Sequence, residues 1–486
     1  MRQPFGVMGV AAYSCPRLPV IKSSKARQII QSRQMSSGSQ TSAVSAQQGP
    51  AFLDSPFLSG WDDLEVVTER LGTALDDTQS SGTSSTRIES AVCESLADHS
   101  GLSGDLKLLT LTLSSENENS AKNEIKLLIK QSMPGEKKAK SSKAFGKYRE
   151  AYMYSTIGPW LRERLGAQSD CSFIPQAHYA VADPCVGQYS VVTDYYDGSI
   201  EAGLFYPKSI HNSSNEKRRT KTLPASISRQ DVTLEAVRVA AKIHGCFFLD
   251  ETLLNSGRIS KHLRMTDWIR GNGRDSFLAS QQMIQNGWSS AKLKHEKGEH
   301  DIAMKQKFIE VMETSVGQAL DFDAFVSKWS GAGEGKLPFT LVHGDFHPGN
   351  LLVTASSVEN GKAELILVDW EAVGVGSGPQ DLGQFLISHS DAAEAVDLLD
   401  RITSLYRKTL VDTIAETNPS LVGSVPSAES TRREIIYGGL ERWVWLFSVM
   451  CNMPIPSNYM QYFHDQMYDW IVLNDVTSES IGMPRP

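Results

Sequence analysis

The amino-acid sequence predicts an α+β fold in which a smaller, β-rich N-terminal part precedes a larger helical part. Three early segments alternate apolar and polar residues, as half-buried antiparallel strands do: 88–96, 106–113 and 124–130. Beyond residue 230, apolar residues recur every three or four positions, which is the period of a helix with one buried face. A short run at 341–353 interrupts the helical part and carries the polar residues that point to chemistry.

The run at 341–353 predicts a strand, a polar loop and a second strand, and a third strand is expected at 365–368. The last two of these strands should pair as a hairpin. We expect its turn at Asn360-Gly361, because this dipeptide tolerates the positive φ that tight hairpin turns need.

Three polar side chains should meet at the end of this small sheet: Asp345, Asn350 and Asp369. In phosphoryl transfer from a metal-bound nucleotide, one carboxylate accepts or orients the proton of the attacking hydroxyl. A carboxamide and a second carboxylate hold Mg²⁺. His343, Asp345 and Asn350 match the H-x-D-x-x-x-x-N spacing of a kinase catalytic loop, and Asp369 follows at a strand end. The alternative is a buried polar turn whose side chains cap backbone groups.

The stretch HGDFHPGN at 343–350, followed by VDWE at 368–371, resembles the aminoglycoside-phosphotransferase and choline-kinase-like small-molecule kinases. The resemblance implies a two-lobed protein-kinase-like fold, with a small antiparallel β-rich N-lobe and a larger helical C-lobe. It also implies ATP and Mg²⁺ as cofactors. The chain departs from protein kinases, because Asp369-Trp370-Glu371 stands in place of DFG and no APE-type segment follows.

The composition is that of an ordinary globular protein. Of the 486 residues, 40% are hydrophobic and 21% are charged, and the net charge of −8 offers no basic field for nucleic acid. No apolar run approaches the ~20 residues that a membrane span needs. The six cysteines include no C-x-x-C pair, which favours a reduced intracellular protein without a zinc site.

The first 53 residues differ in composition from the rest of the chain. They include basic residues but no acidic one, since the first acid is Asp54, and the segment 36–48 is rich in serine, glutamine and alanine. This composition is typical of a transit peptide for a mitochondrion or plastid. The alternative is a plain disordered tail, in which case we expect a cytoplasmic protein.

A helix is expected over 59–77, because its apolar residues recur at spacings of three and four and two aspartates mark its start. Between the first two strands, Gly101 and Gly104 would let backbone N–H groups approach phosphates closely, as in a nucleotide-covering loop. An ordinary hairpin loop accounts for the same two glycines.

In the resembled fold, a lysine at the end of the third strand holds the nucleotide phosphates, and Lys130 ends the run Leu-Leu-Ile-Lys there. We expect a lysine-rich loop over 135–143 and then a helix that begins near residue 144. A glutamate on that helix should pair with the lysine. We assign Glu150 to this role, with Glu163 as the alternative; otherwise Glu150 is a solvated surface residue.

Two more strands are expected around 172–182 and 188–196. In the resembled kinases such a strand leads into a hinge whose backbone binds adenine, which assigns Asp194 and Tyr195 to cofactor binding. A strand followed by an Asp-Gly turn accounts for the same residues. We place the boundary between the two lobes after residue 197.

The larger part should begin with a polar stretch over 207–229, interpreted as a solvated insertion or as a grip for an anionic substrate. Helices are expected over 232–248, where His244 should be a satisfied core residue, over 261–320 and over much of 392–472.

At 378–381, proline followed by an acid starts one helix of the larger part. In the resembled kinases an aspartate at this place braces the catalytic loop. Asp381 is therefore expected to give structural support, as are His343 and His347.

Together these features predict a leader over 1–53, an N-lobe over 54–197 and a C-lobe over 198–486. The expected function is ATP- and Mg²⁺-dependent transfer of the γ-phosphate to a hydroxyl or amine of a small molecule, with Asp345 accepting the proton. The alternatives are a nucleotide-binding pseudokinase or scaffold, and a kinase that acts on protein or on protein-bound sugar adducts. We expect neither a nucleic-acid partner nor a membrane span. The sequence does not specify the acceptor or the oligomeric state.

Overall fold

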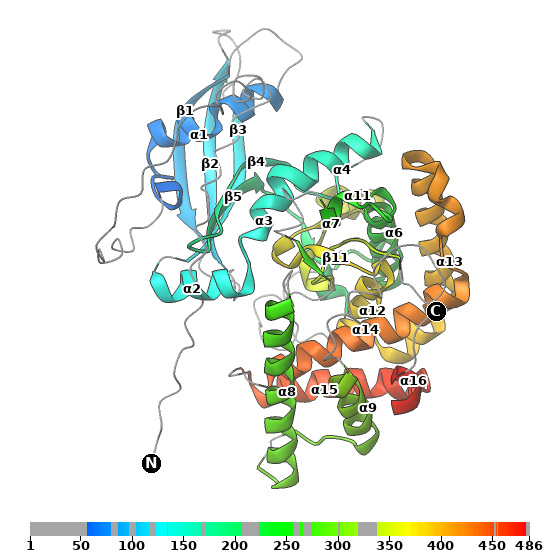
Figure 1. The fold of residues 1–486 in the computed structure, drawn as a ribbon. Helices are drawn as coiled ribbons and strands as arrows, with labels where there is room; N and C mark the ends of the chain where they lie inside the picture. Colours follow the sequence, from blue (N-terminus) through cyan, green and yellow to red (C-terminus); the bar gives the residue numbers. More distant parts are fainter. Residues whose placement is uncertain are drawn as a thin grey trace, which may run out of the picture. The chain divides into compact units, whose positions relative to one another are not determined.

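The computed structural model describes these residues: 56–78, 86–96, 104–115, 123–133, 135–166, 171–206, 223–255, 263–265, 274–299, 302–318, 338–451, 453 and 455–482. They form two compact units (Figure 1). The first comprises the described residues up to Ala151 together with His178–Val192, and the second comprises Tyr152–Ala177 and the described residues from Thr193 onward. The predicted leader over 1–53 lies outside the described residues.

A five-stranded sheet in the order β1-β2-β3-β5-β4 forms the framework of the first unit. Its strands are β1 (Thr86–Ser95), β2 (Asp105–Ser115), β3 (Asn123–Gln131), β4 (Ala177–Asp183) and β5 (Gln188–Asp194). β1, β2 and β3 pair antiparallel in succession, which confirms the arrangement predicted from their alternating patterns.

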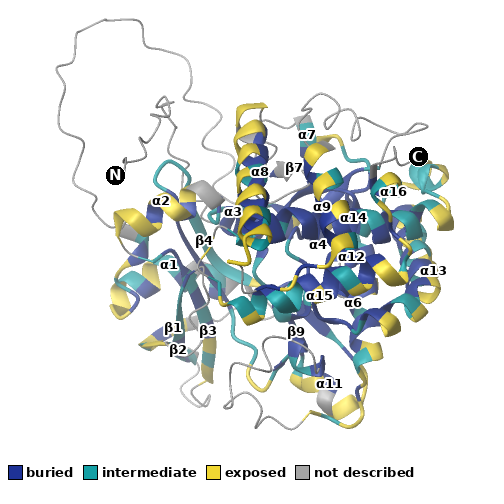
Figure 2. Cartoon of the chain, turned by 90° about the horizontal axis from the view of Figure 1, so that it is seen from below, coloured by how far each residue is buried: buried dark blue, intermediate teal, exposed yellow. Residues whose placement is uncertain are grey.

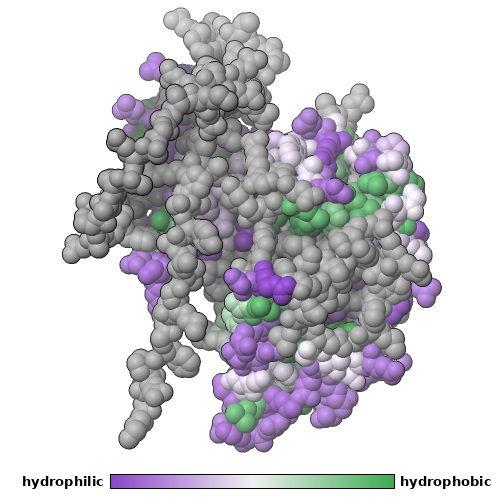
Figure 3. Space-filling model, in the orientation of Figure 1, coloured by the Kyte–Doolittle hydropathy of each residue, from purple (hydrophilic) through white to green (hydrophobic). Residues whose placement is uncertain are grey.

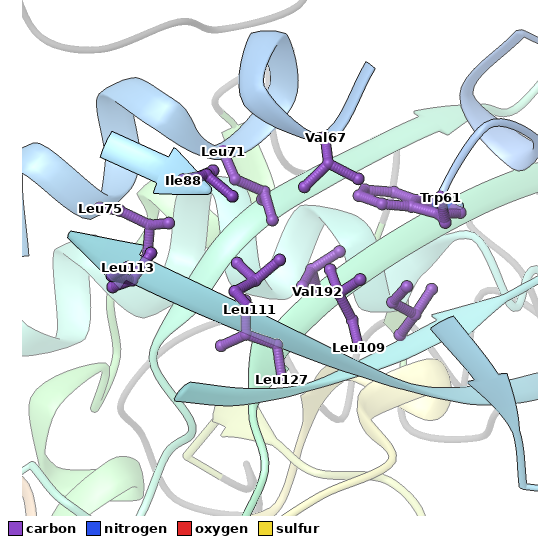
Figure 4. Close-up of a cluster of buried hydrophobic side chains, with 11 residues drawn as sticks. Trp61, Val67, Leu71, Leu75, Ile88, Leu109, Leu111, Leu113, Leu127 and Val192 are labelled. Atoms are coloured by element: carbon purple, nitrogen blue, oxygen red, sulfur yellow. The ribbon is translucent and has the colours of Figure 1, made fainter. Parts of the chain in front are cut away.

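Helix α1 (Leu64–Thr78) packs its apolar side on one face of this sheet (Figure 4). The period of two puts Leu109 and Leu111 of β2 on that face, together with Leu127 and Ile129 of β3. Lys130 therefore belongs to the opposite face of the sheet. The buried cluster consists of Trp61, Val67, Leu71, Leu75, Ile88, Leu109, Leu111, Leu113, Leu127, Ile129 and Val192.

The chain after β3 becomes helical earlier than predicted. The expected loop over 135–143 is wrong, because α2 (Glu136–Phe145) occupies it. Lysine is a good helix former, and Lys140 pairs with Glu136 one turn earlier at 2.6 Å. Gly146, at a φ of 68°, ends α2 in a left-handed cap. The short helix α3 (Arg149–Tyr152), a π-helical turn over Met153–Ile157 and α4 (Gly158–Leu165) follow.

The second unit is mostly helical, as predicted. After α4, its helices are α6 (Arg229–Cys246), α7 (Thr252–Asn255), α8 (Arg274–Glu296), α9 (Gln306–Gln318), α11 (Ala355–Asn360), α12 (Gly378–His389), α13 (Ala392–Thr417), α14 (Ala428–Met450), α15 (Ser457–Leu473) and α16 (Ser478–Gly482). α12 packs on α14, and α13 packs on α6. Figure 2 shows α12 and α14 mostly in the colours of buried residues, whereas α8 and α13 each have an exposed side. The α+β fold class predicted from the sequence is confirmed.

Two small sheets lie among these helices, in the orders β10-β9-β6 and β7-β11-β8. Their strands are β6 (Ile200–Glu201), β7 (Arg264–Met265), β8 (Thr340–Val342), β9 (Leu351–Val353), β10 (Leu365–Leu367) and β11 (Gly374–Gly376). β9 and β10 pair antiparallel, as predicted. The tight turn expected at Asn360-Gly361 is wrong, because α11 fills the connection. Gly361 does adopt a positive φ, of 67°, but as the cap that ends α11.

Helices α12 and α14 cross with their backbones in close approach. A Cβ on Gly383 of α12 would lie 2.2 Å from the carbonyl oxygen of Ile435. A Cβ on Gly439 of α14 would lie 2.4 Å from the Cα of Gly383. Only glycine fits on both sides, so these two residues set the separation of the helices.

Among the described residues, no helix is both long enough and apolar enough to cross a membrane. Figure 3 shows the described residues on one face of the molecule as mostly hydrophilic, interrupted by separate hydrophobic patches. Exposed large hydrophobic side chains include Leu278 and Leu293 on α8 and Val472 and Leu473 on α15.

We predict that Gly383→Ala lowers the free energy of unfolding by more than about 2 kcal/mol, because the added methyl group would force two packed backbones apart. Urea denaturation followed by circular dichroism measures the change. The matched control is Gly317→Ala on α9, where a Cβ would meet nothing within 4 Å. That variant should be neutral or gain up to about 1 kcal/mol. Equal stabilities of the two variants would contradict the close crossing.

Candidate active site

The loop between β8 and β9 carries Asp345 and is anchored to the first turn of α12. The backbone N–H groups of His343 and Gly344 donate to the Asp381 carboxylate at 2.8 Å and 3.2 Å. Gly344 has a φ of 78°, and a Cβ there would lie 2.2 Å from the carbonyl oxygen of Ala372. Gly344 therefore adopts a backbone conformation that other residues rarely adopt. It also lies so close to Ala372 that no side chain would fit. The predicted brace role of Asp381 corresponds to these two hydrogen bonds.

His343 is buried and joins the loop to the end of β10. Its Nε2 donates to the carbonyl oxygen of Val368 at 3.1 Å, and its Nδ1 accepts from the N–H of Asp345 at 3.4 Å. Burial lowers the pKa of His343, which keeps the ring neutral, as both hydrogen bonds require. The ring also lies 4.4 Å from that of Trp370.

The two carboxylate oxygens of Asp345 have different partners. Oδ1 accepts from Nε2 of Gln384 at 2.9 Å. Oδ2 has only longer contacts, 3.4 Å to Nδ2 of Asn350 and 3.6 Å to Nε2 of His347. The side chain of Asp345 is 34% exposed. One oxygen is thus firmly held, whereas the other can still take part in chemistry.

Burial by itself raises the pKa of Asp345, but His347 and Arg442 outweigh burial and hold the pKa below its usual value. Asp345 is therefore ionised at neutral pH. In return, burial lowers the pKa of His347, but Asp345 and Asp369 outweigh burial and raise this pKa above its usual value. The N–H of Gly349 donates to Nδ1 of His347 at 3.1 Å, which favours the unprotonated ring. The charge on His347 is therefore set by competition between these neighbours.

Asn350 ends the short 3₁₀ turn Pro348–Asn350 and is almost fully buried. Its Nδ2 donates to the backbone oxygen of Asp345 at 2.9 Å, which leaves Oδ1 as the atom for a cation. The backbone oxygen of Asn350 accepts from the N–H of Val368 at 3.0 Å, which brings the start of the next residue, Asp369, close to the same turn. Asp369 adopts a left-handed conformation with a φ of 64°, which is uncommon outside glycine and clusters at functional sites.

Carboxamide and carboxylate oxygens are the ligands that Mg²⁺ prefers, and Mg²⁺ commonly takes few of them from protein. Among the described residues, no group of three or more His, Cys, Asp or Glu side chains is arranged to hold a metal. The chemistry of the Asn350 and Asp369 side chains suits a magnesium ion that keeps water and phosphate oxygens as its other ligands.

Two residues near Asp345 were not predicted from the sequence: Gln384 and Arg442. Arg442 of α14 is buried, and its Nε donates to Oε1 of Gln384 at 3.2 Å. Its Nη2 donates to the carbonyl oxygen of Gly344. Gln384 lies three residues after Asp381, hence on the same side of α12, and this spacing could have identified it. No sequence signal links Arg442 to the loop.

In the first unit, Nζ of Lys130 lies 2.7 Å from Oε2 of Glu150, and their side chains are 13% and 3% exposed. The structure therefore brings this predicted pair together, and Glu150 is not a solvated surface residue. The alternative partner, Glu163, lies on α4 in the second unit. A Cβ on Gly104 would lie 3.1 Å from the carbonyl oxygen of Gln131, so this glycine packs against the end of β3. Gly101 lies outside the described residues.

Asp194 ends β5, and Tyr195 follows it in the second unit. The N–H of Asp194 donates to the carbonyl oxygen of Gln176 at 3.1 Å. Both residues are half-buried. Their place at the end of a strand is the one that the sequence predicted; a contact with adenine stays a prediction.

We predict that Asp345→Asn lowers the pKa of His347, because the carboxylate that raises this pKa disappears while burial, which lowers it, remains. Histidine side-chain NMR titration of the two proteins measures the shift. His464 on α15, whose pKa is also lowered by burial, is the internal control and should not change. An unchanged pKa of His347 would show that the two side chains do not interact.

A family model described as the phosphotransferase enzyme family matches residues 281–410. No curated protein matches this sequence. Among solved structures, a choline kinase from Cryptosporidium parvum Iowa II is 11% identical, with a TM-score of 0.40 over 81% of this chain and 92% of that one. A choline/ethanolamine kinase family protein from Mesorhizobium loti is 12% identical, with a TM-score of 0.37 over 86% of this chain and 99% of that one.

A thermostable mutant of an aminoglycoside phosphotransferase, in complex with ADP and hygromycin B, is 10% identical, with a TM-score of 0.30 over 86% of this chain and 100% of that one. TM-scores this low carry no information about the substrate. The matched segment, in contrast, contains the β8–β9 loop with Asp345 and Asn350, the following Asp369 and the whole of α12. Residues 281–410 are therefore similar to the phosphotransferase enzyme family over the segment that contains these side chains.

Proposed function

We propose that the protein is an ATP- and Mg²⁺-dependent phosphotransferase that moves the γ-phosphate of ATP to a hydroxyl, or an amine, of a small molecule. The environment of Asp345 carries the proposal. Its carboxylate is ionised, one oxygen is fixed by Gln384, and Asn350, which can offer a carboxamide oxygen to Mg²⁺, contacts the other. A buried polar turn that served only to cap backbone groups would not need an ionised and partly exposed carboxylate.

Asp345 would accept the proton of the acceptor at a carboxylate oxygen. Because its pKa is low, this carboxylate is a weak base. Its main contribution is therefore to orient the hydroxyl and to take its proton late, when bond formation to phosphorus has made that proton acidic. Such a role suits phosphoryl transfer, whose loose transition state needs positioning and charge neutralisation more than a strong base.

Asn350 and Asp369 would hold Mg²⁺, which neutralises charge on the phosphates when it is bound. Lys130 would bind the phosphates, and its pairing with Glu150 fixes the position of its ammonium group. A buried ion pair is weak support for stability, since desolvation offsets the attraction, so a functional reason for this pair is the better account. In the same proposal, Gly104 belongs to the loop that covers the phosphates. The backbone at Asp194 and Tyr195 would bind adenine.

We predict that Asp345→Asn lowers turnover by about 10³-fold while ATP still binds, because the variant loses the proton acceptor but keeps the side-chain shape. The assay is an untargeted screen of small alcohols and amino-alcohols for ATP-dependent phosphorylation. Binding is followed as Mg²⁺-dependent thermal stabilisation by ATP. If the variant turns over as fast as the wild type, the role assigned to Asp345 is wrong.

The same screen separates the alternatives. Stabilisation of the wild type by ATP and Mg²⁺ without a phosphorylated product from any acceptor would favour a pseudokinase or scaffold. Phosphate found in polypeptide rather than in a small molecule would favour a kinase that acts on protein or on sugar adducts attached to protein.

We further predict that Glu150→Gln raises the KM for ATP by roughly tenfold or more, because the Lys130 ammonium loses the carboxylate that holds it. Steady-state kinetics with ATP as the varied substrate measure the change. Glu163→Gln is the matched control, since it removes the same charge from the alternative residue and should leave the KM unchanged. A larger effect from Glu163→Gln would reverse the assignment.

A further inference from the structure

We propose that Gln384 and Arg442 form a positioning relay for Asp345, which leaves Oδ2 rather than Oδ1 to receive the proton of the acceptor. This inference rests on the proposed function, to which it adds two residues that do not touch the substrate. Three features of the second unit carry it: the partner of each carboxylate oxygen, the chemistry of the donors, and the anchoring of the main chain.

The first feature is the difference between the two oxygens of Asp345. Gln384 donates to Oδ1 at 2.9 Å and is itself 1% exposed, so this partner cannot be replaced by bulk water. The contacts of Oδ2, at 3.4 Å and 3.6 Å, are longer than a good hydrogen bond. The terminal torsion of an aspartate is otherwise soft. One short hydrogen bond from a buried side chain therefore selects one orientation of the carboxylate.

The second feature is the direction of the Gln384 amide. A glutamine amide has a donor side and an acceptor side, and only the donor side can hold an ionised carboxylate. Arg442 donates from Nε to Oε1 of Gln384 at 3.2 Å, and a guanidinium cannot accept a hydrogen bond. The oxygen of Gln384 must therefore face Arg442, and its nitrogen must face Asp345. Arg442 thus sets the direction of the relay.

The third feature is the main chain before Asp345. Arg442 also donates from Nη2 to the carbonyl oxygen of Gly344, so a single guanidinium holds both the backbone of the loop and, through Gln384, the carboxylate. The indole of Trp443 donates to the backbone oxygen of Gln384 at 3.1 Å. The glycine crossing of α12 and α14 lies next to Gln384, at Gly383, and three residues before Arg442, at Gly439. The separation of the two helices therefore determines whether the side chains of Gln384 and Arg442 can contact each other and the loop.

Two substitutions of Gln384 separate positioning from packing. Gln384→Met keeps the length of the side chain but removes both hydrogen bonds. Gln384→Glu keeps a partner for Arg442 but cannot donate to Asp345. A merely structural role predicts that Gln384→Glu resembles the wild type, because its ion pair with Arg442 compensates. The relay predicts that both variants are impaired.

The expected result is a fall in kcat of roughly 10- to 100-fold in both variants with the KM for ATP unchanged, on the acceptor that the screen identifies. The matched control is Gln466→Met on α15, which removes a buried glutamine that donates to the carbonyl oxygens of Ile387 and Ser390 at the far end of α12. Its kcat should equal that of the wild type. A wild-type kcat for Gln384→Glu would overturn the relay.

A second measurement does not depend on activity. In protein labelled with ¹⁵N-glutamine, the side-chain amide of Gln384 is assigned from the signal that Gln384→Met lacks. A hydrogen bond to a charged carboxylate should shift one amide proton downfield, and Asp345→Asn should reverse the shift. If the signal is the same with and without the Asp345 carboxylate, the relay is wrong even if the protein is a kinase. A reversed shift without phosphorylation of any acceptor would support the hydrogen-bonded relay and overturn the proposed function.

Discussion

The site depends on the hydrogen bonds that the Asp381 carboxylate accepts from the loop. This carboxylate accepts hydrogen bonds from two successive backbone N–H groups of the loop and so ties that loop to the start of α12. A buried carboxylate without such donors would cost several kcal/mol, and two buried N–H groups without an acceptor would add to that cost. His244 lies 3.5 Å from the same carboxylate and is hydrogen-bonded to Tyr406, as expected of a satisfied core histidine. The loop between β8 and β9 is therefore part of the core of the second unit.

This anchoring explains how a partly exposed carboxylate can be held in one orientation. Asp345 follows the braced backbone directly, and helices α12 and α14 hold its side chain through Gln384 and Arg442. Nearby positive charge and hydrogen bonds lower its pKa against the effect of burial. In the proposed function, its contribution would therefore depend on orientation rather than on basicity, which suits phosphoryl transfer.

In the first unit, a positively charged side chain, that of Lys130, is likewise held by a partner from another element. Its apolar cluster with α1 occupies one face of the sheet, and Lys130, by strand alternation, belongs to the other. Glu150 then supplies the opposite charge from a helix later in the chain, at 2.7 Å. The pairing requires a buried glutamate where sequence patterning alone also allowed an exposed one. Each unit thus contains a charged side chain that a partner from another element holds in place.

The strands, most of the helices and the spacing of Asp345 and Asn350 could be predicted from the amino-acid sequence, because period and local motif depend on neighbours along the chain. Where a short pattern is compatible with two conformations, packing between distant segments selects one of them. An Asn-Gly pair serves a hairpin turn or a helix cap equally well, and at Gly361 packing selected the cap. Arg442 acquires its role only because two glycines let α12 and α14 touch. Arg442 is far in sequence from the residues that it contacts, so no periodic pattern predicts these contacts. They can be identified only in the folded structure.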